Sequence, residues 1–137
     1  MKKVRVNSNF FSEKGYYMKK TLEFINEKTN SFKPEIGIIL GSGLGELADE
    51  YCDFAISYND IPDFIKSTVH GHKGRLVFSE IQDKKIVMMQ GRNHFYEGHS
   101  MREITYPVKV MKALGVKTLI LTNAAGAVNE NFKPADL

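Results

Sequence analysis

The sequence lacks the features that mark several classes of protein. Its 137 residues include one cysteine, Cys52, which cannot form an internal disulfide, so we expect a reducing, cytoplasmic setting. No apolar stretch approaches the roughly 20 residues that a membrane-spanning helix needs. The lysines near the N-terminus precede no apolar block, so we expect no secretory signal and no membrane partner.

A large excess of charge is also missing. Lysine and arginine total 19, aspartate and glutamate total 16, and the formal net charge is +3. This balance is too mild to indicate nucleic acid binding by itself, and we expect no nucleic acid partner. Hydrophobic residues at 42% and charged residues at 26% exclude a disordered, collagen-like or coiled-coil chain and favour a single globular domain.

Apolar periodicity predicts alternating helices and strands after a polar arm over residues 1–12. The expected helices cover 13–29 (with Ser12 as its N-cap), 46–51 and 100–114, and the expected strands cover 36–40, 53–58, 74–81, 84–90 and 116–121. The run 36–40 is short, apolar throughout and bounded by turn residues. Such a run is typical of a strand buried on both faces of a parallel sheet.

One βαβ unit can be read from this pattern. Ser100 and Glu103 have the spacing of a helix capping box, and Gly115 is expected to end that helix. Pro107 lies inside it and predicts a kink or a later start. The strands before and after this helix are then parallel and joined by a right-handed crossover. The fold class is therefore α/β.

Three unusual segments follow the three most apolar strands: 41–45 (GSGLG), 91–98 (GRNHFYEG) and 122–126 (TNAAG). Ligands of open α/β sheets bind beyond the carboxyl ends of the strands. If these strands are parallel, the three segments meet at one edge of the sheet. We expect them to surround a single cavity of the size of an oxyanion.

The first segment favours an anion. Glycines present backbone N–H groups without a Cβ in the way, Ser42 adds a hydroxyl, and the following helix N-terminus adds a favourable dipole. Glu46 stands where a dinucleotide fingerprint has its third glycine, and the Lys-Ser/Thr of a Walker loop is absent. The alternative is a tight turn between strand and helix.

The second segment combines an arginine, an imidazole and a phenol. Arg92, His94 and Tyr96 are spaced by two residues, so in an extended loop their side chains share one side. Such a wall suits an anion beside a hydroxylated ring, such as a sugar. We predict His94 and Glu97 as a catalytic pair, in which the carboxylate holds the imidazole in one tautomer or raises its pKa. The alternative for Glu97 is a helix-start glutamate favoured by the dipole.

The stretch from His70 to Arg75 places two histidines and two cations in a glycine-containing loop. A His-x-His pair can bind metal, but no further ligand cluster completes a site, so we expect no metal. A phosphate contact from one histidine is the better hypothesis. The alternative for Lys73 and Arg75 is plain solvation.

The motifs GSGLG, STVHGHKGRLVF, VMMQGRNHFYEG, YPVKVMKALGV and LTNAAGAVN occur in this order from about Ile36 to Leu137. Their order and spacing resemble those of the trimeric purine nucleoside phosphorylases. The resemblance implies a three-layer fold with a mixed, mostly parallel sheet and flanking helices. It also implies a pentosyltransferase of purine salvage, which converts a purine (deoxy)ribonucleoside and phosphate into purine base and pentose 1-phosphate.

The resemblance further implies the site residues. It places Tyr96 against the pentose and a set of six residues around the phosphate: Ser42, His72, Arg92, Asn93, His94 and Ala124. Inorganic phosphate is then a substrate, and no metal or organic cofactor is needed. The expected partners are a purine nucleoside, phosphate and, at full length, two further copies in a homotrimer.

Members of that family are about twice as long as this chain. We therefore expect residues 13–137 to be the N-terminal half of one α/β phosphorylase domain, without the base-binding residues. Alone, it is expected to show no useful turnover and to expose sheet edges and apolar surface. The alternatives are a methylthioadenosine phosphorylase and a non-catalytic phosphate- or nucleotide-binding module.

Overall fold

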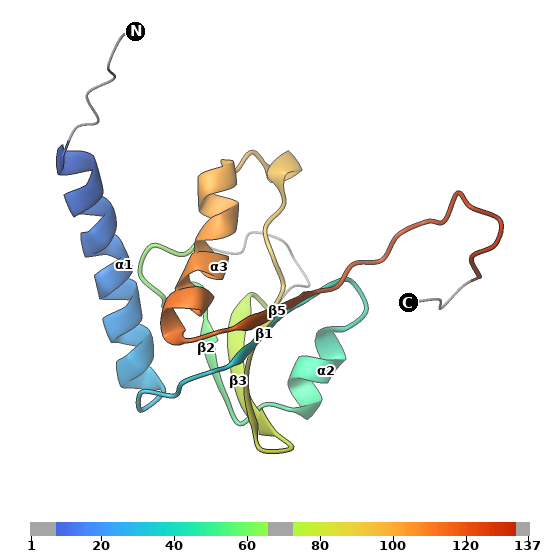
Figure 1. Ribbon diagram of the computed structural model, residues 1–137, viewed down its shortest axis with the longest axis horizontal. Coiled ribbons are helices and arrows are strands. Elements are labelled where there is room, and N and C mark those ends of the chain that lie inside the picture. The colour runs from blue at the N-terminus through green and yellow to red at the C-terminus, as the bar shows by residue number, and fades with distance from the viewer. Residues whose placement is uncertain (1–7, 66–72, 134–137) are drawn as a thin grey trace, which may run out of the picture.

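The computed structural model describes residues 8–65 and 73–133, and these form one sheet with helices on both faces (Figure 1). The elements in chain order are α1 (Ser8–Lys28), β1 (Ile36–Leu40), α2 (Gly45–Glu50), β2 (Phe54–Ser57), β3 (Arg75–Ile81), β4 (Lys84–Gln90), the 3₁₀ helix η1 (Phe95–Glu97), α3 (Met101–Leu114) and β5 (Thr118–Leu121). Among the described helices, none is both long enough and apolar enough to cross a bilayer.

The sheet has the strand order β2-β3-β4-β1-β5. Strand β1 pairs in parallel with β4 and β5, whereas β3 pairs antiparallel with both β2 and β4. Four of the five strands therefore point the same way, and β3 alone opposes them. This confirms a mixed, mostly parallel sheet, and it confirms that β4, α3 and β5 form a βαβ unit, with β1 between its two strands.

Alternation along the strands divides the core into two layers. Leu76 and Phe78 of β3 belong to the cluster beneath α1 and α3, together with Ile25 and Val110 of those helices. Val77, between them in sequence, belongs to the opposite cluster, against α2. Because successive strand residues face opposite sides, each strand contributes to both layers. The result is the three-layer arrangement expected from the sequence.

The central strands are apolar on both faces because both faces are covered. Val87 and Met88 of β4 are neighbours in sequence, face opposite layers and are fully buried. Burying a side chain of this size contributes about 1.5–3 kcal/mol. The strand ends that support the loops therefore rest on a rigid layer.

Helix α3 begins and ends as the sequence predicts. The Glu103 backbone N–H donates to Ser100 Oγ and the Ser100 N–H donates to Glu103 Oε2, at 3.3 and 2.8 Å. At the other end Gly115 has a φ of +122°. Pro107 is buried inside the helix, so the later start that we considered is wrong: the capping box already begins the helix at Met101.

Two predicted boundaries were wrong by more than one residue. Helix α1 begins at Ser8, so residues 8–12 of the expected arm are helical and Ser12 is not the N-cap; no glycine or proline between Ser8 and Ser12 stops the helix there. Strand β5 begins at Thr118 rather than at residue 116. The N–H of Val116 instead donates to the Met111 carbonyl, which completes a Schellman motif at the end of α3.

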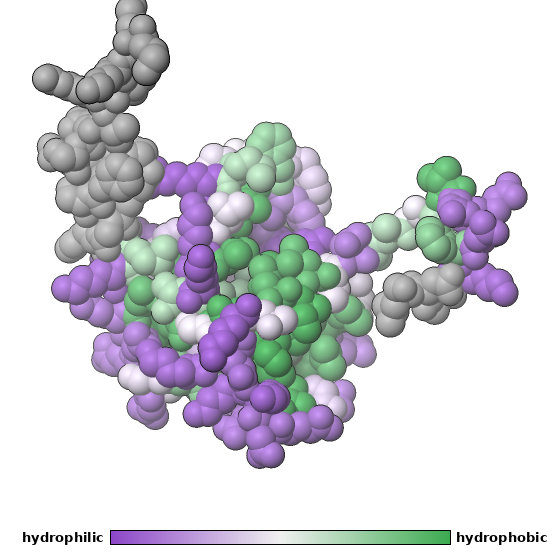
Figure 2. Space-filling view, in the orientation of Figure 1, coloured by the Kyte–Doolittle hydropathy of each residue, from purple (hydrophilic) through white to green (hydrophobic). Residues whose placement is uncertain are grey.

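One edge of the described sheet is apolar and open. Strand β5 has a partner on one side only among the described residues, and Ile120 and Leu121 are 44% and 64% exposed. Figure 2 shows apolar side chains gathered on the face over β5 and α2, where Leu44 and Leu47 are also exposed. The expectation of an exposed edge with apolar surface is confirmed.

Candidate functional site

The three segments that follow β1, β4 and β5 lie at the same edge of the sheet. Leu40 is in register with Gln90, and Ile39 is in register with Leu121, so the strands end within one residue of each other. The segments also touch, because Thr122 Oγ1 accepts a hydrogen bond of 2.8 Å from the Gly41 N–H. The predicted convergence is confirmed.

Close packing requires glycine at position 41. A Cβ there would lie 2.6 Å from the backbone oxygen of Thr122, so any larger residue would push two strand ends apart. Two residues later Gly43 has a φ of +87°, which favours glycine, and the Leu44 N–H donates to the Gly41 carbonyl at 3.2 Å. Residues 41–45, called the glycine turn below, therefore lead tightly from β1 into α2.

A polar cavity of about 320 Å³ lies beside the glycine turn. Its lining includes Ser42 and Gly43 from the turn, Lys73 two residues before β3, and Arg92 and His94 from the segment after β4. Two cationic side chains, an imidazole, a hydroxyl and a glycine-rich backbone thus face one space, which the carboxylates of Glu46 and Asp49 also line. This set of groups suits a small oxyanion.

A larger and mainly apolar cavity of about 580 Å³ lies on the other side of Arg92 and His94, which line both. Asn93 and Ala124 line it with apolar residues of the sheet and α3. The expectation of a single cavity is therefore wrong, since Ser42 lines the polar cavity and Ala124 lines the larger one. The Arg92 side chain contributes to the division, because its Nη1 donates to the Thr122 carbonyl oxygen at 2.8 Å.

His94 and Tyr96 share a side, as predicted, but not in an extended loop. Their rings stack with centroids 4.9 Å apart and planes 11° from parallel, while Phe95–Glu97 forms the short 3₁₀ helix η1. The segment curls because the Glu97 N–H donates to the His94 carbonyl and Glu97 Oε1 accepts from the His94 N–H, at 3.1 and 2.6 Å. Tyr96 is 83% exposed and lines neither cavity.

These contacts favour one of the two roles considered for Glu97. Its Oε1 holds the backbone of His94 rather than the imidazole, which is the behaviour of a residue that begins a helical turn. Its Oε2 lies 3.9 Å from Nε2 of His99, and both atoms are buried without a hydrogen bond to any residue in the described part of the chain. His99 was not among the predicted site residues, and its position two residues after Glu97 was the available signal.

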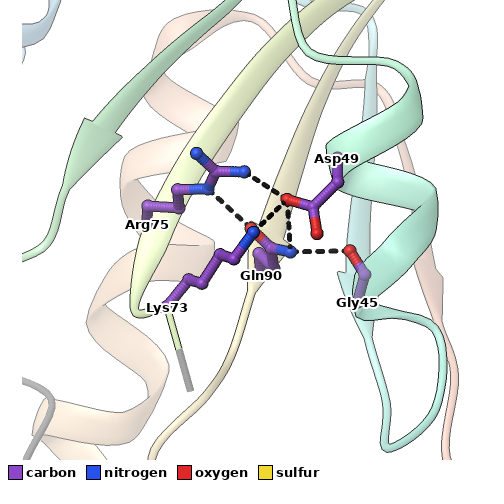
Figure 3. A network of polar contacts seen from close by, with 5 residues as sticks. All are labelled: Gly45, Asp49, Lys73, Arg75 and Gln90. Atoms are coloured by element: carbon purple, nitrogen blue, oxygen red, sulfur yellow. Dashed lines mark hydrogen bonds and ion pairs between the residues drawn. The ribbon is translucent and has the colours of Figure 1, made fainter. Parts of the chain in front are cut away.

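Lys73 and Arg75 form ion pairs, so the alternative of plain solvation is wrong for both. Figure 3 shows both directed at Asp49 of α2, whose Oδ1 accepts from Lys73 Nζ at 2.7 Å and from Arg75 Nη2 at 2.6 Å. These bonds, with one from Gln90, hold the pKa of Asp49 below its usual range. Neither Asp49 nor Gln90 was predicted, although a glutamine at the end of an apolar strand was a usable signal.

Two predictions concern histidines at 70 and 72, and both positions lie outside the described residues. The phosphate contact expected of His72 therefore stays a prediction. Within the ranges 8–65 and 73–133, histidine, cysteine, aspartate and glutamate side chains form no group of three that would hold a metal ion.

Comparison with known proteins gives consistent matches. The model of the Phosphorylase superfamily matches residues 35–137. The chain is 56% identical over 116 residues to purine nucleoside phosphorylase 1 of Geobacillus stearothermophilus, covering 84% of this chain and 42% of that protein. It is 50% identical over 107 residues to purine nucleoside phosphorylase of Mus musculus, covering 77% and 37%.

Solved structures agree with this result. A purine nucleoside phosphorylase in complex with ribose-1-phosphate superimposes with a TM-score of 0.77 at 50% identity, covering 85% of this chain and 43% of that one. Isoform 2 from Schistosoma mansoni, in complex with cytosine and ribose-1-phosphate, gives 0.79 at 46% identity, covering 86% and 41%. The chain thus spans about two fifths of the length of these relatives. The family model and these relatives confirm the resemblance, and the chain belongs to the Phosphorylase superfamily, in which its similar relatives are purine nucleoside phosphorylases.

Proposed function

We propose that this chain forms the phosphate- and pentose-binding part of a purine nucleoside phosphorylase. The activity is the reversible conversion of a purine nucleoside and phosphate into free base and pentose 1-phosphate. The observation that supports it best is the position of Arg92 and His94 between a polar cavity and a larger, mainly apolar one. An anion in the first is then next to a sugar and base in the second.

In this proposal the polar cavity takes phosphate. Ser42 donates a hydrogen bond from its hydroxyl, and the glycine turn presents backbone N–H groups. Arg92 contributes positive charge and His94 contributes a ring N–H group. One of the N–H groups of Arg92 is used on Thr122, which leaves the others for the anion. Asn93 and Ala124 line the neighbouring space. Tyr96 lines neither cavity, and its assignment to the pentose rests on the family resemblance.

The chemistry follows from this geometry. Cleavage of a glycosidic bond passes through an oxocarbenium-like state, with positive charge on the sugar and negative charge on the leaving base. A fixed phosphate dianion stabilises that cation and then bonds to the anomeric carbon, so the electron pair of the broken bond leaves with the base. Positioning and preorganised charge account for most of the rate. Phosphate is itself the nucleophile, so the proposed reaction uses no metal or organic cofactor.

The proposal extends to the rest of the enzyme only through its relatives. We assign base recognition to residues that this chain does not contain. We also propose that the full-length protein is a homotrimer in the cytoplasm. The identity of up to 57% with enzymes of this name supports the activity, whereas the assembly and the location rest on the family resemblance.

Phosphorolysis assays test the proposal. The protein at full length should release base from inosine or guanosine only when inorganic phosphate is present, whereas residues 1–137 alone should bind phosphate without turnover. Preference for methylthioadenosine would instead identify the related phosphorylase, and phosphate binding without turnover at full length would identify a non-catalytic module.

The role of Arg92 gives a sharper test within the same assay. Arg92→Ala removes hydrogen bonds to a charged partner, each worth about 1.5–3 kcal/mol, so the phosphate KM should rise at least about tenfold. The nucleoside KM should change little. Equal losses for both substrates would contradict the assignment of Arg92 to phosphate.

A further inference from the structure

Gln90 ends strand β4 and is 5% exposed. Its carboxamide makes three hydrogen bonds to two other elements (Figure 3). Oε1 accepts from Nε of Arg75 on β3 at 2.6 Å. Nε2 donates to the carbonyl oxygen of Gly45 at 2.6 Å and to Oδ1 of Asp49 on α2 at 3.1 Å. Each polar atom of this buried amide therefore has a partner.

The two ends of this network are the two loops that line the polar cavity. Gly45 is the last residue of the glycine turn, and Gln90 is two residues before Arg92. The carboxamide joins them directly, since one bond connects the end of β4 to the start of α2. A shift of either loop relative to the other must break or lengthen that bond.

We propose that Gln90, held in orientation by Arg75 and Asp49, is a positioning residue that fixes the glycine turn relative to Arg92 and so sets the affinity of the polar cavity for phosphate. The inference rests on the proposed function, in which that cavity takes phosphate. The inference adds Gln90, Arg75 and Asp49 to the site. These residues do not touch the reacting atoms, and the sequence did not assign them to the site.

The orientation of the amide is fixed by its partners. Arg75 Nε can only donate, so it must meet the oxygen of Gln90, and the amide nitrogen then points at Gly45. Arg75 is held in turn by its Nη2 on Asp49, at 2.6 Å. Asp49 belongs to α2, the helix that follows the glycine turn, and so it holds the arginine from that helix. Lys73 contacts the same carboxylate.

Direct electrostatics predicts the opposite effect of Asp49. Its carboxylate is 37% exposed and lines the polar cavity, so its negative charge repels a bound phosphate. Exposed ion pairs of this kind add little stability. Removing Asp49 thus strengthens phosphate binding if charge alone matters, and weakens it if the carboxylate positions Arg75 and Gln90.

The sign of this change is the experiment. Inorganic phosphate is titrated into the protein and its variants by isothermal calorimetry at fixed ionic strength. Asp49→Ala should bind phosphate at least about threefold more weakly, and Gln90→Leu about tenfold more weakly, close to the loss of one hydrogen bond to a charged group. Unchanged or tighter binding by Asp49→Ala overturns the proposal.

Two further variants separate positioning from charge and from general loss of stability. Arg75→Lys keeps the positive charge but lacks the rigid planar group that bonds Gln90 through Nε and Asp49 through Nη2, so it should weaken phosphate binding; wild-type affinity would overturn the proposal. Thr21→Val removes a buried hydroxyl that bonds to Pro62 and Tyr106, and none of these three residues lines the polar cavity. It should lower the unfolding midpoint and leave phosphate affinity within about twofold.

The wild-type titration distinguishes the two levels of inference. If the wild-type protein does not bind inorganic phosphate, the proposed function fails. If it binds and Gln90→Leu binds equally well, the positioning role fails while the proposed function stands. At full length, the loss should appear in the phosphate KM and leave the nucleoside KM unchanged, which a general structural defect would not do.

Discussion

Replacing Tyr58 by phenylalanine tests how firmly one buried hydroxyl holds the end of β4. Tyr58 directly follows β2 and is 3% exposed, and its hydroxyl donates to the Gly91 carbonyl oxygen at 2.8 Å. Burial raises the pKa of the Tyr58 phenol, so the hydroxyl keeps its proton throughout the neutral range. The substitution keeps the ring and its contact with Phe64, 5.6 Å between centroids, and removes only the donor.

The expected loss follows from the acceptor left behind. A buried polar group without a partner costs about 1–3 kcal/mol. Gly91 also lines the polar cavity, where water can replace part of the bond, so we expect Tyr58→Phe to lower the free energy of unfolding by about 1.5 kcal/mol. For a chain of this size that is about 5 °C in Tm.

Urea denaturation followed by far-UV circular dichroism measures this loss, since the chain has no tryptophan to report by fluorescence. Tyr51→Phe is the matched control, because Tyr51 is 38% exposed and should unfold within about 0.5 kcal/mol of wild type. A loss below about 0.5 kcal/mol for Tyr58→Phe would show that the Gly91 carbonyl does not depend on this donor.

Two other substitutions test the capping of α3 and the close contact beneath the glycine turn. Ser100→Ala should destabilise the protein by about 1 kcal/mol in urea denaturation. Hydrogen bonds from Ser100 lower the pKa of Glu103 below its ordinary 4.5. They therefore stabilise the fold above pH 4.5, and this stabilisation is lost as the pH falls through the lowered pKa. The free energy of unfolding of Ser100→Ala should therefore fall less steeply than that of the wild type as the pH is lowered. Gly41→Ala puts a Cβ 2.6 Å from the Thr122 oxygen and should lower stability by about 1–3 kcal/mol together with phosphate affinity, whereas Gly126→Ala, with open space around its Cβ, should do neither.

Local pattern was sufficient to predict most of the secondary structure. Strand β1 covers Ile36–Leu40 as expected, because a short apolar run between turn residues has few alternatives. Helix α3 was predicted by a capping box and a terminal glycine, both formed by residues close in sequence. The start of β5 was missed because Val116 could continue the strand or complete the helix end, and the bond to Met111 decides for the helix.

The position of the site was predictable, and its internal contacts were not. Convergence of the three segments follows from the parallel direction of β1, β4 and β5, which the sequence pattern indicates. The network around Asp49 depends instead on side chains separated by 26 residues from Arg75 and by 41 from Gln90, and no local pattern relates them. For Glu97 the spacing gave the correct neighbour, His94, but did not distinguish its backbone N–H from its ring.

The order of the strands explains how the protein itself orients the Arg92 side chain. Strand β1 separates β4 from β5, and neighbouring strands lie about 4.8 Å apart, so a group at the end of β4 must reach about 10 Å to contact the end of β5. Arginine is long enough to do so, and its Nη1 bonds to the Thr122 carbonyl oxygen. That bond fixes the plane of the guanidinium, and the remaining N–H groups are held at the boundary of the two cavities. In the proposed function, a phosphate entering the polar cavity meets a donor that this bond already orients, which lowers the entropic cost of binding.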